Sequence, residues 1–258
     1  MKVSRKSPGE RSSWGMSDVG RKRKTNEDAL FVDDELGLYI VADGMGGHAA
    51  GEIASREATA TIYSMIKQAV HEFGELKSPL TEARMRAACQ LMESAIQAAT
   101  SIIYSMAELD RQKAGMGTTI SALLLSGEYG IIGHVGDSRI YHVNGEKFEQ
   151  LTEDHSLIAW QLKQGLISEE EAMVSPYRNV ITRAVGNRDH VEVDTVVFPV
   201  ERHSRFLLCS DGLHGYLRSG DIVPTVGIGG ESAVRQFVDL ANQRGGKDNI
   251  TVILVELN

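Results

Sequence analysis

The chain has 258 residues, 42% of them hydrophobic, which is enough to bury a sizeable core in one large domain or two small ones. Charged residues make up 24%, close to the average for globular proteins, so extensive disorder is not expected. The formal net charge of -8 makes nucleic acid and anionic membrane surfaces poor partners.

The N-terminal segment is polar, basic and without periodicity, and we predict a flexible tail over residues 1–13. It lacks the apolar core of a secretory signal, and no apolar run reaches the ~18 residues that span a bilayer. Cys89 and Cys209 lie in apolar runs and are expected to be buried free thiols rather than part of a disulfide framework. These features predict a cytoplasmic protein.

Short β-rich runs and long helical stretches follow one another along the chain without strict alternation. Apolar runs rich in β-branched residues predict strands at residues 38–42, 118–125, 129–135, 139–143, 206–209 and 250–255. Apolar residues at helical spacing predict helices at about residues 49–70, 79–109 and 231–243. Turns such as Asn144-Gly145 between neighbouring strands favour antiparallel pairing. Because no linker divides the chain, we expect one α+β domain over residues 14–258.

Residues 154–183 have a different pattern. A first helix, at about residues 156–164, is expected to end at a glycine. A second begins at Ser168, and Glu171 three residues later completes the pattern of a capping box. Pro176 then ends this helix. We predict a compact helical insert between strands, and inserts on a rigid scaffold often carry binding residues.

Four aspartates stand at the ends of apolar strands. Asp43, Asp137 and Asp211 follow strands, and Asp248 precedes the last one. Carboxylates that converge in one cleft repel each other, so they must protonate or bind cations. Ligation by oxygen alone favours Mg²⁺ or Mn²⁺ over zinc. A single Asp-Gly after a strand is usually only a turn, so the spacing alone leaves a metal site and a set of turns both open.

Short motifs occur in a fixed order along nearly the whole chain. They are Asp18-Val19-Gly20, Arg23, Asn26-Glu27-Asp28, Val41-Ala42-Asp43-Gly44-Met45-Gly46-Gly47-His48, Gly115-Met116-Gly117-Thr118-Thr119, Gly136-Asp137-Ser138-Arg139, Asp154-His155-Ser156, Arg178-Asn179-Val180-Ile181-Thr182-Arg183, Ser210-Asp211-Gly212-Leu213 and Asp248-Asn249-Ile250-Thr251. Each motif is weak alone, but the ordered set is specific. In this set the chain resembles the bacterial members of the type 2C (PPM) family of metal-dependent Ser/Thr protein phosphatases.

The resemblance implies a four-layer α-β-β-α sandwich with two mainly antiparallel sheets and a metal centre at one end. It also implies that the insert over residues 154–183 is the flap that bacterial members carry beside the cleft. Four residues of this chain match the flap motifs: Asp154, Ser156, Arg178 and Arg183.

By the same resemblance, two Mn²⁺ or Mg²⁺ ions are expected at the metal centre, together with a third, weaker ion. Asp43 would bridge the first two ions. The carbonyl of Gly44 would hold one of them, and Asp211 and Asp248 would hold the other.

The resemblance also implies roles for residues around the first two ions. Glu27 and Asp28 would act mainly through metal-bound waters. Asp137, with Asp211, matches the position of the third ion. Arg23 would grip the substrate phosphate, a task that suits a bidentate guanidinium better than an ammonium.

The implied reaction is hydrolysis of phosphoserine and phosphothreonine in proteins, by direct attack of a hydroxide that bridges two metals. Arg23, Asp43, Asp211 and Asp248 are the expected catalytic residues. Phosphorylated proteins are the expected partners, with a bacterial eukaryotic-like Ser/Thr kinase and its targets as the counterpart. A monomer is expected.

Two alternative functions belong to other classes. A catalytically inert type 2C-like binding module would typically lack a metal aspartate, whereas Asp43, Asp211 and Asp248 are all present. A non-enzymatic cation-binding protein would not need Arg23 beside the acidic cluster. Hydrolysis of an aryl phosphate with and without Mn²⁺ separates all three.

Two residues depart from the family pattern. Many eukaryotic relatives carry histidine, the proposed general acid, where this chain has Met45, so the leaving oxygen must obtain its proton elsewhere. Ser175 stands where relatives often have histidine before the proline of the flap. The second departure concerns flap contacts and leaves the metal centre intact.

Overall fold

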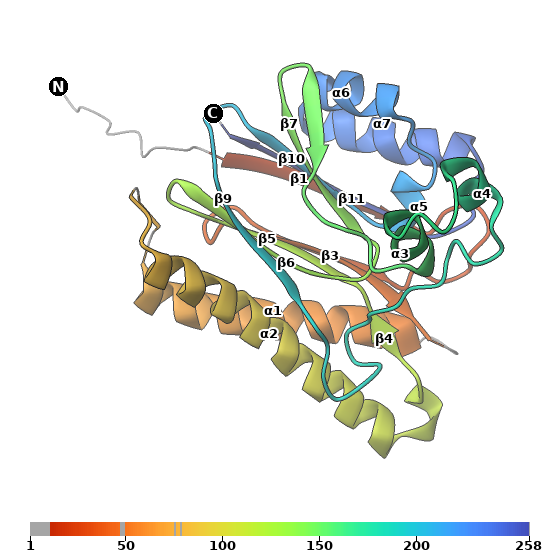
Figure 1. Ribbon diagram of the computed structural model, residues 1–258, viewed down its shortest axis with the longest axis horizontal. Coiled ribbons are helices and arrows are strands. Elements are labelled where there is room, and N and C mark those ends of the chain that lie inside the picture. The colour runs from red at the N-terminus through yellow and green to blue at the C-terminus, as the bar shows by residue number, and fades with distance from the viewer. Residues whose placement is uncertain (1–10, 47–49, 75, 78, 258) are drawn as a thin grey trace.

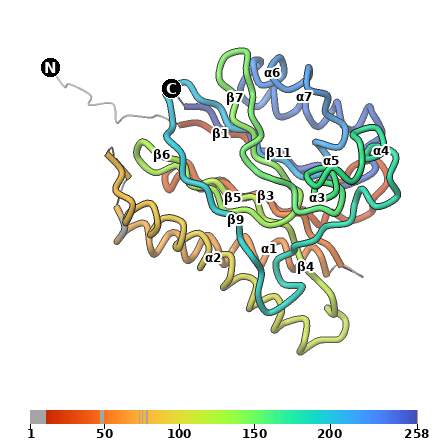
Figure 2. Tube along the Cα trace, in the orientation of Figure 1, coloured from red at the N-terminus to blue at the C-terminus, as the bar shows by residue number. Residues whose placement is uncertain are grey.

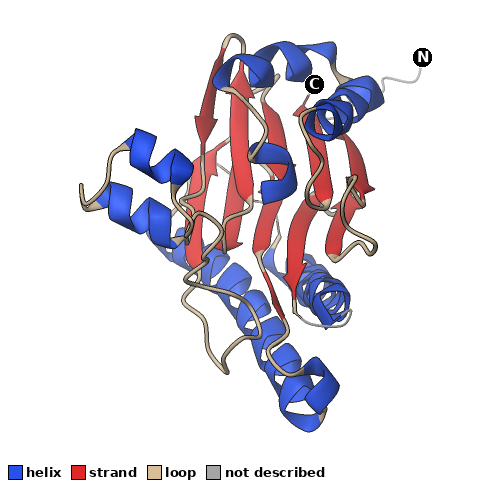
Figure 3. Ribbon diagram, turned by 90° about the vertical axis from the view of Figure 1, so that its right-hand side faces the viewer, coloured by secondary structure: helices blue, strands red, loops and turns tan. Residues whose placement is uncertain are grey.

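Two β-sheets lie face to face, with helices on both outer sides (Figure 1). The computed structural model describes residues 11–46, 50–74, 76–77 and 79–257. Every strand pair in both sheets is antiparallel. The predicted four-layer α-β-β-α sandwich is therefore confirmed, and Figure 3 shows the helices on either side of the strands.

The first sheet has five strands in the order β1-β11-β10-β7-β8. In that order they are Arg11–Asp18, Ile250–Leu257, Arg205–Cys209, Arg139–Asn144 and Lys147–Gln150. The second sheet has the order β2-β3-β5-β6-β9, and the short β4 also pairs with β3. Its strands are β2 Asp28–Asp33, β3 Leu38–Met45, β4 Gly117–Thr118, β5 Ile120–Ser126, β6 Tyr129–Val135 and β9 Asp194–Pro199.

Two groups of helices form the outer layers, and a third lies at one end. The helices on the second sheet are α1 Ala50–Phe73 and α2 Glu82–Leu109, followed by the short 3₁₀ helix η1 Arg111–Lys113. Those on the first sheet are α5 Asp211–His214, α6 Ser219–Ile228 and α7 Gly230–Gln243. The insert forms α3 Leu157–Lys163 and α4 Glu169–Val174, which Figure 2 shows beside α5. None of the described helices has the length and apolar composition needed to cross a bilayer.

Alternation along β3 explains how one strand serves two core layers. Leu38 and Ile40 pack in the cluster with α1 and α2, whereas Tyr39 and Val41 pack between the two sheets. Successive strand side chains point to opposite faces, so a strand covered on both faces reads as a continuous apolar run. The central strands were predictable for this reason, and they form the rigid base from which the site residues project.

The N-terminal boundary differs from the prediction. Strand β1 begins at Arg11, so residues 11–13 belong to the sheet rather than to the predicted tail. These residues pair with the end of β11, and the Arg11 guanidinium donates a 2.7 Å hydrogen bond to the carbonyl of Leu125. The polar side chains of residues 11–13 gave no strand signal in the sequence, and the pairing partner of this strand lies at the other end of the chain. Residues 1–10 lie outside the described residues.

The strand predicted at residues 118–125 is divided into β4 and β5 at Thr119. The Thr119 amide leaves the regular ladder and donates a 2.8 Å hydrogen bond to the carbonyl of Asp43. This interruption places Thr119 against the end of β3, where it contacts Asp43.

Candidate metal centre

The register between β2 and β3 places Asp28 directly opposite Asp43. Opposed residues in an antiparallel pair have neighbouring side chains, so two carboxyl groups meet here. Burial, together with the charges of Asp211 and Asp248, raises the pKa of Asp28 to about 7. Burial and the charge of Asp28 raise the pKa of Asp43 well above its usual value. Ionising both carboxyl groups would cost free energy through their mutual repulsion, unless a cation lies nearby.

Two threonines hold the backbone of Asp43. The Asp43 amide donates to the hydroxyl of Thr119 at 3.0 Å, and the hydroxyl of Thr118 donates to the Asp43 carbonyl at 2.9 Å. The next residue, Gly44, packs so closely against the backbone of Gly51 and Glu27 that a side chain there would collide with both. The position therefore requires glycine, and the Asp43-Gly44 peptide is fixed on both sides.

Asp211 is the first residue of α5, and Ser210 separates it from β10. The interaction of its carboxyl with that of Asp43 contributes to the raised pKa of Asp43. Burial and the charge of Asp248 raise the pKa of Asp211. Carboxyl groups gathered in this way favour either a proton on one of them or a bound cation.

Asp248 joins the acidic cluster to Arg23. Its Oδ2 accepts a 2.7 Å hydrogen bond from Arg23 Nη2, and its Oδ1 accepts one of 2.9 Å from the amide of Asn249. The Arg23 side chain is 50% exposed, so the guanidinium lies at the edge of the cluster, open to solvent. The bond to Asp248 is the main cause of the raised pKa of Arg23.

Asn249 fixes the loop that carries Arg23 and Glu27. Its side-chain amide donates to the carbonyls of Val19 and Thr25 at 3.0 and 2.9 Å, and its Oδ1 accepts from the amide of Glu27 at 2.9 Å. One side chain beside Asp248 thereby holds both ends of the loop. Burial raises the pKa of Glu27, whose carboxyl also interacts with the backbone of Gly51.

Asp137 follows β6 and forms a second acidic position. Burial and then the charge of Asp211 raise the pKa of Asp137 to about 7. His214 Nε2 lies 2.9 Å from the Asp137 carbonyl, and because a carbonyl can only accept, this nitrogen carries the proton. Helix α5 thus supplies Asp211 at its start and the support for Asp137 at its end.

The insert contributes the other side of the site. Burial alone would raise the pKa of Asp154, but hydrogen bonds from Arg139 hold this pKa below its usual value. Ser156 caps α3 by accepting from the amide of Ala159 at 3.1 Å. Arg183 lies at the far end of the insert, where its guanidinium pairs with Asp194 at 2.7 Å. Arg183 is therefore an anchor of the insert.

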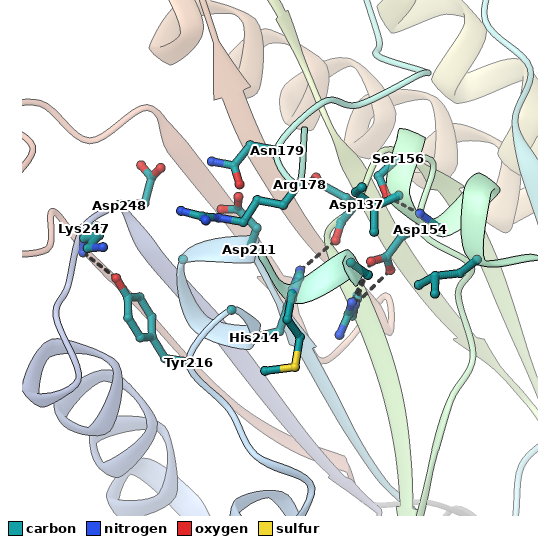
Figure 4. Close-up of a pocket in the computed structure, with 18 residues that line it drawn as sticks. Asp137, Asp154, Ser156, Arg178, Asn179, Asp211, His214, Tyr216, Lys247 and Asp248 are labelled. Carbon is teal, nitrogen blue, oxygen red and sulfur yellow. Dashed lines mark hydrogen bonds and ion pairs between the residues drawn. The ribbon is translucent and has the colours of Figure 1, made fainter. Parts of the chain in front are cut away.

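A cleft of about 650 Å³ opens between the insert and α5. Figure 4 shows Arg178 and Asn179 of the insert extending toward Asp211, with Asp248 and Lys247 on the far side. The predicted residues that line the cleft are Asp137, Asp154, Ser156, Arg178, Asp211 and Asp248. Asp43 is not among the residues that line the cleft, but its carboxyl interacts with that of Asp211, which is.

The donor set fits divalent cations, although the carboxylates do not enclose a space for one as they stand. Among the residues that the structure describes, no three His, Cys, Asp or Glu side chains form a ready cage. Two observations nevertheless favour ions: the raised pKa of Asp43 among the carboxyl groups of Asp28, Asp211 and Asp137, and the Oδ1 of Asp28, which is buried without a hydrogen-bond partner. An orphaned carboxylate oxygen within such a cluster of carboxyl groups is the chemistry that a hard cation satisfies.

Sequence reasoning assigned no role to several residues that build this site. Thr119 holds Asp43, and Asn249 holds the Arg23 loop. Ser210 donates to Asp28 Oδ2 at 2.8 Å while accepting from the Thr251 amide at 3.1 Å. Each of the three stands next to a motif residue or within a motif, which was the available signal. Gly47 and His48, the end of the second motif, lie outside the described residues.

The comparisons with known proteins agree on one family. The protein phosphatase 2C family model matches residues 20–254. The serine/threonine phosphatase stp of Listeria welshimeri is 39% identical over 248 residues, 94% of each chain. The crystal structure of the Mycobacterium tuberculosis serine/threonine phosphatase PstP/Ppp matches with a TM-score of 0.84 at 30% identity, covering 95% of this chain and 98% of that one. A PstP catalytic domain in complex with two manganese ions matches with a TM-score of 0.82 at 29% identity, covering 96% and 98%.

Proposed function

The chain belongs to the protein phosphatase 2C family and is a protein Ser/Thr phosphatase, and from this premise we propose that Asp43, Asp211 and Asp248 hold the two divalent ions of its active site. The observation that carries the proposal is the cluster of buried carboxyl groups of Asp28, Asp43 and Asp211, in which Oδ1 of Asp28 has no hydrogen-bond partner. The manganese pair in the related PstP structure supports the choice of Mn²⁺, with Mg²⁺ as the alternative. The presence of all three aspartates argues against an inert binding module.

Bound ions would supply positive charge and an activated water for attack on phosphorus. The chain's own residues would do the positioning. Asp43 would help to hold both ions, because it stands opposite Asp28 and its carboxyl interacts with those of Asp28 and Asp211. The carbonyl of Gly44 would bind one ion, and Glu27 and Asp28 would act through water.

Arg23 would bind the substrate phosphate. A guanidinium has five N–H donors, so its bond to Asp248 leaves donors for phosphate oxygens. The loop that carries Arg23 is held by Asn249, so the charge is presented from a fixed backbone. Asp248 would thus serve both the ions and the residue that grips the phosphate.

Replacement of Arg23 by alanine is expected to raise KM for a phosphopeptide by about 10-fold, with a smaller change in kcat. The reason is that a phosphate contact made in both the ground state and the transition state contributes uniform binding. Steady-state kinetics of the variant beside Lys22→Ala, a neighbouring exposed cation, provides the matched control. An unchanged KM for Arg23→Ala would remove Arg23 from the phosphate site.

Replacement of Asp137 by alanine is expected to remove one weak metal site and to leave the two tight ones. Asp137 follows β6 and interacts with the charge of Asp211, so it is proposed to hold a third ion and not to contribute to the first two. Calorimetric titration of metal-free protein with Mn²⁺ tests both this point and the proposed function. Two tight sites and one weak site support it. Identical titrations of the wild type and the variant would refute the role of Asp137, and no tight site in the wild type would refute the proposed metal centre.

The remaining proposals concern partners. We propose that the substrates are phosphorylated proteins, that a Ser/Thr kinase opposes the enzyme, and that the enzyme acts as a monomer in the cytoplasm. The insert over residues 154–183 is proposed to act on protein substrates more than on small aryl phosphates, because it forms one side of the cleft.

A further inference from the structure

The cleft has two chemically different parts. One part is lined by the carboxylates Asp137, Asp211 and Asp248. The other is an apolar wall formed by α3 and α4, whose residues are Ile158, Ala159, Leu162, Ala172 and Met173. Both parts line one continuous cleft of about 650 Å³. A molecule whose phosphate reaches the carboxylates therefore has its flanking atoms beside the apolar wall.

The apolar wall combines buried and exposed residues. Ile158 of α3 and Ala172 of α4 are each only 9% exposed. Leu162 and Met173 are 36% and 79% exposed, and they face the cleft without a covering layer in the described structure. Exposed apolar side chains that line a cleft rimmed by polar groups mark a binding surface more often than chance exposure does.

The opposite side of the cleft offers a matching surface. Tyr216, which follows α5, lines the same cleft, and its hydroxyl accepts a 3.2 Å hydrogen bond from the amide of Lys247. With its polar end engaged in this way, the aromatic body of Tyr216 is held in one position. An apolar side chain in the cleft would thus meet α3 and α4 on one side and Tyr216 on the other.

The apolar wall favours an uncharged flanking side chain. The wall itself contains no charged side chain, and Asp154 beside it is paired with Arg139. The basic residues Arg178 and Lys247 line other parts of the cleft. A charged side chain against the wall would lose its hydration without gaining a partner there, whereas a large apolar side chain would gain free energy from leaving water.

We propose that the apolar wall of α3 and α4 is a specificity subsite that binds a large apolar side chain flanking the phosphoserine or phosphothreonine of a protein substrate. An extended chain advances ~3.3 Å per residue, so the bound side chain lies next to the phosphoresidue or a few positions from it. The inference rests on the proposed function, because it takes the carboxylates as the phosphate end of the cleft.

The test compares pairs of phosphothreonine peptides that differ only at one flanking position, where one peptide has leucine and the other has serine. A pair is made for each flanking position on both sides of the phosphothreonine. The measured quantity is the ratio of kcat/KM for the leucine peptide to that for the serine peptide, taken within each protein variant. The ratio is expected to be at least ~10 for the wild type at one or more positions, the effect of burying an apolar side chain in a pocket. In the double variant Leu162→Ser, Met173→Ser it is expected to fall to about 1.

Leu166→Ser provides the matched control. Leu166 belongs to the same insert and is 60% exposed, but it is not among the residues that line the cleft. This variant is expected to keep the ratio of the wild type. A ratio near 1 at every position for the wild type, or an equal fall in Leu166→Ser and in the double variant, would overturn the subsite. Failure of the wild type to hydrolyse even an aryl phosphate with Mn²⁺ would instead overturn the proposed function beneath it.

Discussion

Replacement of Asp43 or Asp211 by asparagine is expected to lower kcat by at least ~10²-fold at saturating Mn²⁺. Asparagine keeps the shape of the side chain and one oxygen, but it loses the charge and the second oxygen with which an aspartate would bridge or hold ions. The two variants should behave alike, because the Asp43 and Asp211 carboxyl groups interact directly within one buried cluster.

The same variants have a second readout that separates lost function from lost folding. In the metal-free protein, Asp43 and Asp211 both have raised pKa values because they are buried among carboxylates. An amide at either position removes one acid from the cluster and can still donate a hydrogen bond, so the metal-free Tm of each variant should equal or exceed that of the wild type.

Asp239→Asn is the control for these variants, since Asp239 lies on an exposed position of α7. It should leave both kcat and Tm unchanged. Near-normal turnover of Asp43→Asn or Asp211→Asn at saturating Mn²⁺ would count against the metal assignment. A large fall in their metal-free Tm would show that the two aspartates serve the fold instead.

Exhaustive chelation is expected to reduce phosphate release to the level of the uncatalysed reaction, and added Mn²⁺ should restore it. The physical reason is that the described Ser and Cys side chains near the site are engaged or inert. Cys209 is buried, and burial raises the pKa of its thiol to about 12. The hydroxyl of Ser210 is hydrogen-bonded to Asp28 and the Thr251 amide, and that of Ser156 caps α3. Measurement of phosphate release from a phosphothreonine peptide, before and after chelation, checks this directly. Full activity in the chelated protein would contradict the two-metal account.

The stability of the chelated protein should depend on pH in a stated direction. An aspartate in an unfolded chain has a pKa of about 3.9, whereas the folded-state pKa values of Asp28 and Asp137 are about 7. The folded metal-free chain therefore binds more protons than the unfolded chain between these values. Its stability falls as pH rises through this window, and the penalty is complete above about pH 7.

Mn²⁺ should consequently raise the Tm more at pH 8 than at pH 5, because at pH 8 the ions relieve a repulsion that protons relieve at pH 5. Thermal unfolding with and without Mn²⁺ at the two pH values measures this. A larger metal-induced shift at pH 5 would show that the carboxylates are not the groups that bind the ions.

The central strands and long helices were predictable because burial shapes their sequences. Residues 38–42 of β3 are covered on both faces and form an unbroken apolar run. In contrast, β1, β2, β8 and β9 are edge strands that are only partly buried, so none of them forms an unbroken apolar run. Their places in the sheets are set by partners far away in the sequence.

The sequence identified the aspartates of the site, but it did not identify the contacts between them. Asp43, Asp137, Asp211 and Asp248 stood out because each adjoins an apolar strand. The opposition of Asp28 and Asp43 depends on the β2–β3 register, and a slip of one residue would move Asp28 to the other face. Such pairings are properties of the assembled sheets, and a local sequence pattern does not contain them.

The apolar wall of the cleft was not predictable from the sequence, for a related reason. The capping box at Ser168 and Glu171 predicted where α4 begins, and the structure confirms it. Leu162 and Met173 belong to different helices, however, and they share a wall only because α3 and α4 pack together beside α5. Helical periodicity identifies the face of one helix, but it does not identify the neighbour that this face meets.

A crystal structure of the protein grown with Mn²⁺, with anomalous scattering used to locate manganese, tests the central claim most directly. The account predicts two anomalous peaks that share the Asp43 carboxylate, with Asp211 and Asp248 at coordination distance from one of them. The ions should take the place of the proton that the raised pKa of Asp43 favours in the metal-free protein. The absence of a manganese peak beside Asp43 would contradict the account.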